Sequence, residues 1–146
     1  MTIIVTVMGV NTQFSIAVHM LAGLGYRNGK DTTSGELARS VNTSPSFVRR
    51  TLSKLSKAGL VETATGKAGA CWLGKKPEQI SLLDIYRAVD APKAFSIHNY
   101  AEQENCRVSC HIKAALNGAL RKTQKAMEAS LDDISLAQIV SAMKGK

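Results

Sequence analysis

Apolar residues recur at steps of three and four along most of the chain, which is the spacing of helices that pack one face against a core. The first such run spans Thr12 to Leu24 and is followed by Gly25 and a polar stretch ending at Asp31. Its apolar positions are Phe14, Ala17, Val18, Leu21 and Leu24. We therefore predict an amphipathic opening helix that ends near Gly25.

Two short helices separated by a polar turn are predicted next. Thr33 followed by Glu36 forms a capping-box pattern that opens the first of them. Ser44 is a typical N-cap of the second, and Pro45 takes the first helical position, where its missing N–H costs no hydrogen bond. The apolar positions that would face the core are Leu37, Ala38, Val41, Val48, Leu52 and Leu55.

A β-hairpin is predicted directly after these helices. Residues 60–64 and 70–73 have strand character, and the turn between them carries Gly66 and Gly69. Two helices, a tight turn and a glycine-bearing hairpin in this order indicate a winged helix-turn-helix. Ser81 then opens a further short helix, and residues 93–105 show no regular pattern.

The longest helical pattern runs from Arg107 to about Ser130. Its apolar stripe consists of Val108, Ile112, Ala115, Leu116, Ala119, Thr123, Ala126 and Met127. Such a helix is roughly 35 Å long, more than so small a body can cover, so we expect a second subunit to pack on it. Packing within its own chain is the alternative. Asp133 or Ser135 caps a last helix. The predicted fold class is therefore mainly α with a small β wing: a winged helix-turn-helix plus a long dimerisation helix.

Positive charge is concentrated in the first half of the chain. Residues 1–76 hold ten Lys/Arg and three Asp/Glu, a net charge of +7, whereas residues 77–146 hold nine and eight, a net charge of +1. This asymmetry is typical of a polyanion binder, although a merely soluble basic surface would also produce it. We assign residues 1–76 to a DNA-binding domain, 77–105 to a connecting helix and cysteine-bearing loop, and 106–146 to a dimerisation helix and C-terminal helix.

Cysteine usage and hydropathy point to a cytoplasmic protein without a membrane partner. Cys71, Cys106 and Cys110 form no disulfide framework of a secreted domain. The apolar opening MTIIVTVMGV lacks a basic flank and is too short to span a bilayer. We therefore expect reduced thiols.

The second helix of the helix-turn-helix carries the candidate contacts to double-stranded DNA. Such a helix fits the major groove, where Arg can fork onto guanine and Ser or Lys can anchor phosphates. A hairpin tip with a lysine would lie at the minor groove or the backbone. The predicted DNA-binding residues are Ser44, Ser46, Phe47, Arg49, Arg50, Lys54 and Lys67.

Four segments together resemble the IscR/NsrR/CymR type of bacterial winged-helix regulator, the Rrf-two family, and most closely its YwnA-like members. They are NTQFSIAVHML, SVNTSPSFVRRTLSKLSKAGLV, GKAGACWLGK and ISLLDIYRAVD, and the resemblance extends from Asn11 to Val140. It implies a homodimer whose long helices cross, with DNA binding controlled by chemistry at the cysteine segment.

Three positions depart from the family pattern. Iron–sulfur members carry three closely grouped cysteines, whereas here only Cys106 and Cys110 lie in that segment and Cys71 is in the wing. Thr65 stands where some relatives have a wing arginine, and Arg49 stands where the iron–sulfur type has an acidic residue. The operator sequence therefore does not carry over.

The cysteine segment is a candidate redox sensor. Cys106 stands at the start of the long helix, beside Arg107, where free N–H groups and the helix dipole favour the oxidisable thiolate. Its disulfide partner is Cys110 of the same chain, Cys110 of a second subunit or a small thiol. Both cysteines could instead be small core residues, and Cys71 is expected to fill space beneath the wing beside Trp72.

A bound metal is the competing input. His98, Cys106, Cys110 and His111 supply ligands that zinc accepts, but their spacing matches no standard finger. We therefore predict no metal ligands and no cofactor, with zinc or an iron–sulfur cluster as the alternative.

The function that these features favour is a homodimeric DNA-binding transcriptional regulator, a repressor that responds to thiol stress through Cys106. An enzyme is disfavoured because there is no Cys-x-x-Cys motif, no catalytic triad pattern and no phosphate-binding loop. A winged helix used only for protein interaction is the remaining alternative.

Overall fold

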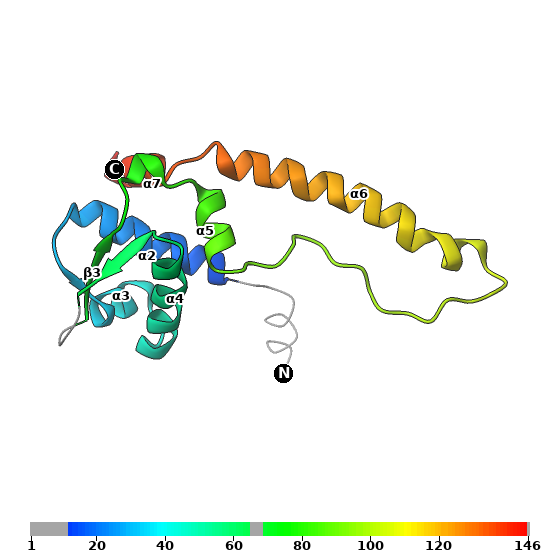
Figure 1. Cartoon of the computed structure of the whole chain (residues 1–146), viewed down its shortest axis with the longest axis horizontal. Helices are drawn as coiled ribbons and strands as arrows, with labels where there is room; N and C mark the ends of the chain where they lie inside the picture. Colours follow the sequence, from blue (N-terminus) through cyan, green and yellow to red (C-terminus); the bar gives the residue numbers. More distant parts are fainter. Residues whose placement is uncertain (1–11, 65–68, 146) are drawn as a thin grey trace.

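The structure, a computed structural model, describes residues 12–64 and 69–145. In these described residues, nine short elements form a rounded body, and the tenth element, a single long helix, projects from it (Figure 1). Lys67 and the tip of the predicted hairpin lie outside the described residues. No helix in the described part of the chain is long and apolar enough to cross a membrane.

The helix-turn-helix is built from α2 (Gln13–Arg27), α3 (Ser34–Val41) and α4 (Pro45–Lys57). The Thr33 side chain caps α3 through the backbone N–H of Glu36, and the Glu36 carboxylate accepts from the backbone N–H of Thr33, so the predicted capping box is confirmed. Asn42 then adopts a left-handed conformation, with φ of 66°, and turns the chain between α3 and α4.

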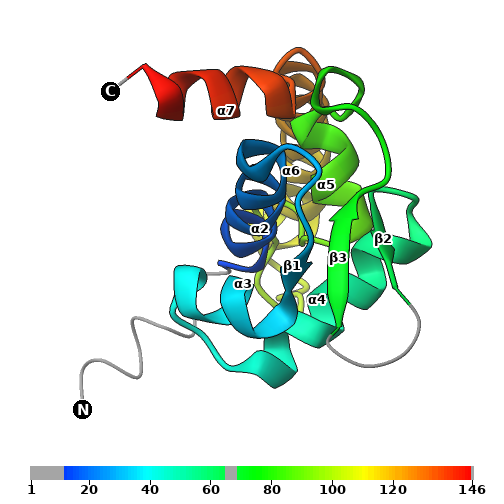
Figure 2. The ribbon, with the colours of Figure 1, turned by 90° about the vertical axis from the view of Figure 1, so that its left-hand side faces the viewer.

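The wing is an antiparallel hairpin of β2 (Val61–Thr63) and β3 (Ala70–Leu73), as expected. A third strand, β1 (Thr32–Thr33), pairs with the other edge of β3, so the sheet order is β1-β3-β2. Figure 2 shows this sheet beside α2 and α4. Cys71, on the central strand, pairs with Thr32 on one side and Thr63 on the other.

The chain then leaves the body and returns to it. A 3₁₀ turn, η1 (Pro77–Gln79), leads into α5 (Leu82–Ala88), an extended strap of residues 92–105, the arm α6 (Arg107–Asp132) and α7 (Leu136–Lys144). Two backbone hydrogen bonds of 2.8 Å close the loop, from Leu82 N to Ile134 O and from Leu136 N to Ile80 O. Of the two predicted caps, Ser135 is the one that α7 uses.

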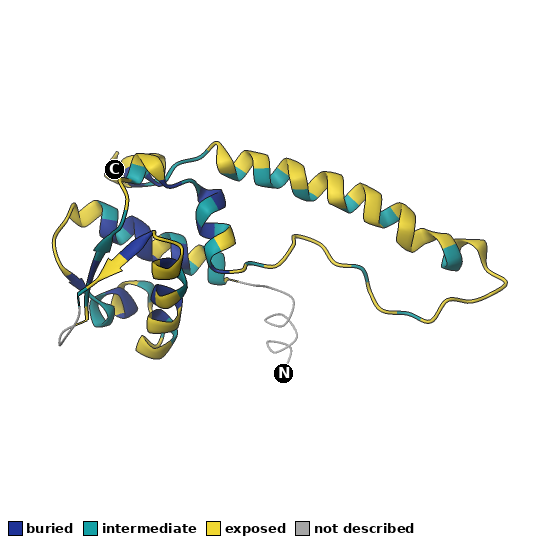
Figure 3. Ribbon diagram, viewed as in Figure 1, coloured by how far each residue is buried: buried dark blue, intermediate teal, exposed yellow. Residues whose placement is uncertain are grey.

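The core lies wholly in the body. Its largest fully buried side chains include Met20, Leu21, Leu55, Ile80, Ile85 and Leu136. The 26-residue arm contributes no buried residue, and Figure 3 shows it as mostly exposed, with intermediate residues recurring along its length. The mainly α fold with a small β wing is thus confirmed, and the arm projects beyond the core.

Two local features differ from the sequence expectation. Helix α2 continues past Gly25 to Arg27, because Asn28 rather than Gly25 takes the left-handed position that ends it. A Cβ on Gly25 would lie 3.1 Å from Val140 Cγ2, so this glycine allows α7 to pack closely on α2. Strand β1 was not predicted, since two threonines are too short a run to show alternation.

Candidate nucleic-acid interface and thiol segment

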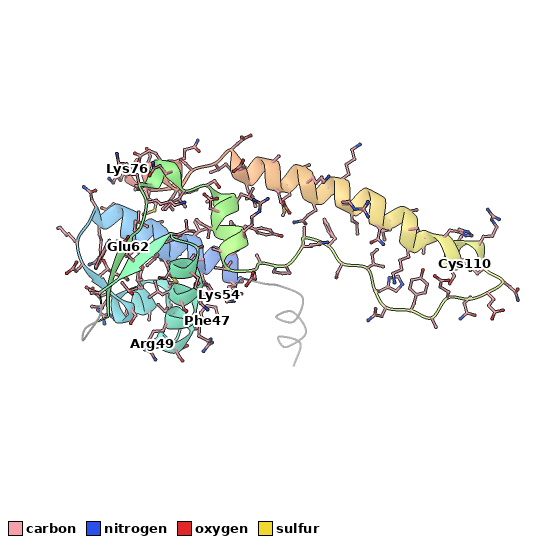
Figure 4. The ribbon with its side chains drawn as sticks, in the orientation of Figure 1. Phe47, Arg49, Lys54, Glu62, Lys76 and Cys110 are labelled. Atoms are coloured by element: carbon pink, nitrogen blue, oxygen red, sulfur yellow. The ribbon has the colours of Figure 1, made fainter. Side chains whose placement is uncertain are left out.

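Helix α4 is amphipathic and turns a basic face outward. Val48, Thr51, Leu52 and Leu55 are buried against the body. Its four cations are Arg49, Arg50, Lys54 and Lys57, and the helix contains no carboxylate. Figure 4 shows α4 on the outer side of the body, at the opposite end of the molecule from Cys110. This placement leaves the outer face of α4 open to a large partner.

Ser44 and Pro45 fix where α4 begins. The Ser44 hydroxyl accepts from the backbone N–H of Phe47 at 3.2 Å, and Pro45 takes the first helical position. Ser46 is exposed in the first turn. Free N–H groups at a helix start favour an anion such as phosphate, and here they are presented beside exposed serines.

Phe47 and Arg50 form a pair on the outer face of α4. The guanidinium carbon of Arg50 lies 5.6 Å from the centre of the Phe47 ring. Phe47 itself is partly buried, and its carbonyl accepts from the hydroxyl of the buried Thr51 at 3.0 Å. The partly buried ring therefore flanks the Arg50 guanidinium on one side.

A hollow of about 400 Å³ separates α4 from the base of the wing. Arg49, Ser53 and Lys57 line it from α4, and Thr63 and Gly69 line it from the hairpin. Sequence reasoning did not select Ser53 or Lys57 as contacts. The signal was present, because residues 49, 53 and 57 follow the four-residue spacing that places side chains in one row along a helix.

Lys54 lies nearer the edge of this surface than Arg49 and Arg50, because it is partly buried whereas both arginines are exposed. The nearby carboxylates have partners of their own. Glu36 pairs with Arg27 at 3.5 Å, and Glu62 accepts from the Trp72 indole at 3.0 Å. The backbone hydrogen bond from Thr33 holds the pKa of Glu36 below its usual range. The cations of α4 therefore form no ion pair with a described carboxylate.

Cys106 is the N-cap of α6. Its Sγ accepts from the backbone N–H of Ser109 at 3.3 Å, and the side chain is exposed. Cys110 is partly buried one turn later, and its thiol donates to the carbonyl of Gln103 at 3.4 Å. The structure therefore brings the two predicted sensor thiols to the same end of the arm, facing different partners.

Ser109 links the tip of the strap to the start of α6. Its hydroxyl accepts from the backbone N–H of Gln103 at 2.9 Å, and its carbonyl accepts from the Tyr100 hydroxyl at 2.7 Å. His98 stacks on Tyr100 with ring centres 5.0 Å apart. The residue whose N–H is capped by Cys106 thus also holds the strap in place.

Cys71 is fully buried beneath the wing. Its thiol donates to the carbonyl of Thr32 at 3.1 Å. Burial, with a smaller contribution from the charge of Glu36, raises the pKa of the Cys71 thiol to about 11. The protonated, enclosed thiol is unsuited to sensing, in line with its expected packing role.

The candidate metal ligands do not converge. Among the described residues, no three side chains of His, Cys, Asp or Glu are grouped so that they could hold a metal ion. His111 Nδ1 is 2.8 Å from the Arg107 carbonyl oxygen, within its own helix. Iron–sulfur clusters need several cysteine thiolates, and Cys71 lies in β3, whereas Cys106 and Cys110 lie at the start of α6, at the opposite end of the molecule (Figure 1). The donor set of one chain does not fit such a cluster.

Comparison with known proteins agrees with this architecture. A family model for Rrf2, described as an iron-dependent transcriptional regulator, matches residues 10–142. The chain is 35% identical over 133 residues to YwnA of Bacillus subtilis (strain 168), named an HTH-type transcriptional regulator, and the match covers 90% of this chain and 97% of that protein.

Solved structures give the same result. A crystal structure described as that of a DNA-binding protein matches with a TM-score of 0.68 at 35% identity, covering 87% of this chain and 97% of that one. CymR (YrzC), the global cysteine regulator of B. subtilis, matches with a TM-score of 0.67 at 23% identity, covering 91% and 96%, and shows the same fold. These relatives are regulators and not enzymes, as the sequence predicted. The chain therefore belongs to the Rrf2 family of DNA-binding transcriptional regulators.

Proposed function

We propose that this chain is a homodimeric repressor that binds DNA through α4 and the wing and releases it when Cys106 is oxidised. The observation that carries the DNA part is the set of cations on α4, which are mostly exposed and lie on a helix that has no carboxylate and packs its other face into the core. The proposed contacts are Ser44, Ser46, Arg49, Arg50 and Lys54, together with Lys67 of the hairpin.

Ser53 and Lys57 join this proposed surface because they share the hollow with Arg49. Phe47 acts in it as the support for Arg50 rather than at the centre of the contact surface. The division of the chain follows: residues 1–76 contact DNA, residues 77–105 connect, and the segment from 106 onward pairs the subunits.

The arm supplies the dimer interface. Val108 is 68% exposed and Ile112 is 40% exposed, and Ala115 and Ala119 continue the same helical face. A helix with one apolar stripe and no buried residue is stable only when another surface covers that stripe. A second arm is the natural cover, because two copies of one stripe are self-complementary about a two-fold axis. Two α4 helices would then reach successive turns of a duplex.

Oxidation is proposed to begin at Cys106. Its thiolate attacks a peroxide, the O–O bond breaks, one oxygen stays on sulfur as sulfenic acid and the other leaves as hydroxide. The sulfenic acid then condenses with a second thiol, forming a disulfide and releasing water. That thiol belongs to Cys110 of either subunit or to a small molecule.

Either product changes the start of the arm. Once the Sγ of Cys106 is part of a disulfide, it no longer accepts from the backbone N–H of Ser109. Ser109 also holds Gln103 and Tyr100, so the strap would be affected as well. A bond to Cys110 also requires the first turn of α6 to distort, because an i,i+4 cysteine pair has poor disulfide geometry in a regular helix. A shifted arm would alter the spacing of the two α4 helices.

The DNA part is tested by fluorescence anisotropy, using the duplex upstream of the chain's own gene and rising salt concentrations. Affinity should fall steeply with salt, and Arg49→Ala or Lys57→Ala should lower the slope of log affinity against log salt by about 1. The control, Lys122→Ala on the arm, should keep the wild-type slope. Salt-independent binding, or equal slopes in all variants, contradicts the assignment.

The sensor part is tested separately by adding peroxide to the reduced protein–DNA complex. Wild-type protein should release the DNA, whereas Cys106→Ser should stay bound. Cys110→Ser identifies the second thiol, with mass spectrometry of the peptide containing Cys106 as the readout. If Cys106→Ser releases DNA like the wild type, the sensor proposal is wrong and the DNA assignment stands.

A further inference from the structure

The strap is fastened to the arm at both of its ends. At its base, the backbone N–H of Ala94 donates to the Gln124 side chain at 3.0 Å, and the same side chain donates to the Tyr86 hydroxyl of α5 at 3.0 Å. At its tip, Tyr100 and Gln103 are held by Ser109. The segment between these two attachments runs alongside the arm (Figure 1).

A hollow of about 700 Å³ lies between the attachments. Phe95 and Ile97 line it from the strap, and Leu120 lines it from α6. Phe95 is 61% exposed, although large aromatic side chains are usually mostly buried. The volume falls in the range of pockets that take small organic molecules, roughly 300–1,000 Å³.

Cations on one row of the arm border this apolar floor. Lys113, Arg121 and Lys125 line the hollow, and residues 113, 117, 121 and 125 are successive positions at four-residue spacing. Like charges at this spacing repel one another, as Arg121 and Lys125 do here. None of the three cations forms an ion pair with a carboxylate in the described part of the chain.

The one carboxylate that lines the hollow is already engaged. Glu128 accepts from Gln124 at 2.9 Å and pairs with Arg87 at 3.4 Å. The hydrogen bond from Gln124, followed by the interaction with Arg87, holds the pKa of this carboxyl below its usual range. Glu128 therefore remains charged and paired with Arg87 at its own end of the hollow. It does not neutralise the positive charges of Lys113, Arg121 and Lys125.

The hollow also remains accessible in the proposed dimer. At 100° per residue, the row of Lys113, Asn117 and Leu120 is turned by roughly 110° about the helix axis from the middle of the whole apolar stripe, which runs from Val108 to Met127. A second arm that covers the stripe would therefore leave the strap side of α6 open.

We propose that this hollow binds a small organic anion with a flat apolar body, of the aromatic carboxylate class. The ring would lie between Phe95 and Leu120, and the carboxylate would face Arg121. Lys113, about 12 Å away along the helix, would add positive charge at the other end of the hollow. The strap is held at both ends by hydrogen bonds and the other wall is a continuous helix, so ordering on binding would be confined to the short segment between the attachments. This binding is distinct from the α4 surface and from the chemistry of the thiols.

The test is calorimetric titration of the full, reduced chain with naphthalene-1-carboxylate, naphthalene-1-methanol and sulfate. The carboxylate should bind once per chain, about tenfold more tightly than the neutral alcohol or the inorganic anion. Equal binding of the alcohol and the carboxylate, equal binding of sulfate, or no heat from the carboxylate at millimolar concentration overturns the proposal.

Matched variants locate the site. Arg121→Gln should weaken carboxylate binding about tenfold, and Phe95→Ser should weaken it similarly. Lys113→Gln should weaken it less, about two- to fivefold. Lys122→Gln removes the neighbouring charge, which does not line the hollow, and should change affinity less than about twofold. A loss in Lys122→Gln equal to that in Arg121→Gln overturns the assignment. So does a change of assembly in Arg121→Gln seen by sedimentation, which would identify the occupant as a second chain.

Discussion

The thiol of Cys71 donates to the carbonyl oxygen of Thr32 across 3.1 Å, and this contact joins the middle of the wing to the short strand before α3. It explains why a cysteine stands at the centre of the sheet. The side chain is fully buried, its donor is satisfied, and its size leaves room for the strands to meet the helices. The same burial has a consequence for stability at high pH.

We expect the free energy of unfolding to fall between about pH 9 and pH 11 because of Cys71. The folded thiol keeps its proton up to a pKa of about 11, whereas the unfolded thiol loses it near 9.0. In this window the unfolded state binds fewer protons, so stability decreases as pH rises, by up to about 3 kcal/mol. Urea unfolding at a series of pH values measures this decrease.

Cys71→Ala is the control for that experiment. It will be less stable at neutral pH, since it loses the hydrogen bond and leaves a small cavity. It should nevertheless show a smaller loss of stability than the wild type on going from pH 9 to 11. Parallel curves for the two proteins would show that Cys71 does not titrate as its burial requires.

Two glycines should respond to alanine in opposite directions. A Cβ on Gly74 would lie 2.6 Å from the carbonyl oxygen of Gly59, so Gly74→Ala forces the backbone apart and should cost about 1–3 kcal/mol. Gly118 lies within α6 with nothing within 4 Å of its added Cβ, so Gly118→Ala should stabilise the arm by about 0.5–1 kcal/mol. Thermal unfolding followed by circular dichroism measures both, and a destabilised Gly118→Ala would mean that another surface packs against this position.

The helix starts could be predicted because they depend on adjacent residues. Thr33, Ser44, Ser81 and Ser135 each cap a helix by accepting from the backbone N–H three positions on, a contact that follows from local sequence alone. The basic face of α4 was also local, because it depends only on helical spacing. Arg49 was selected, and the same spacing would have added Lys57.

The features that were not predicted depend on residues far apart in the chain. Strand β1 exists because β3 lies beside it. The hollow under the strap exists because Gln124 holds Ala94, which is 30 positions earlier. Residues 93–105 show no periodicity, so their sequence indicates an irregular segment but not the surface along which it runs.

Ile112→Glu should separate the proposed dimer. The substitution places a charge in the middle of the apolar stripe, and burying an unpaired carboxylate at an interface costs several kcal/mol. Ala114→Glu introduces the same charge on an exposed position on the other side of the arm and should leave the dimer intact. Sedimentation velocity at micromolar concentration distinguishes the two. Identical sedimentation of both variants would place the interface elsewhere.

The pairing of Phe47 with Arg50 leads to a prediction about how Phe47 contributes to DNA affinity. If the ring acts by orienting the guanidinium, Phe47→Leu keeps the packing on α4 but weakens DNA binding by an amount that depends on Arg50. Arg50→Ala should weaken binding by about 1–3 kcal/mol. In the double variant, Phe47→Leu should then cost almost nothing further.

Anisotropy titrations of the wild type, the two single variants and the double variant form a complete double-mutant cycle. A coupling energy close to the whole effect of Phe47→Leu supports the orienting role, because the ring then has no effect once the arginine is absent. Additive losses would instead mean that the ring contacts the duplex independently of Arg50. Arg49→Ala combined with Phe47→Leu is the matched control. Arg49 is not the cation over the ring, so these two substitutions should add.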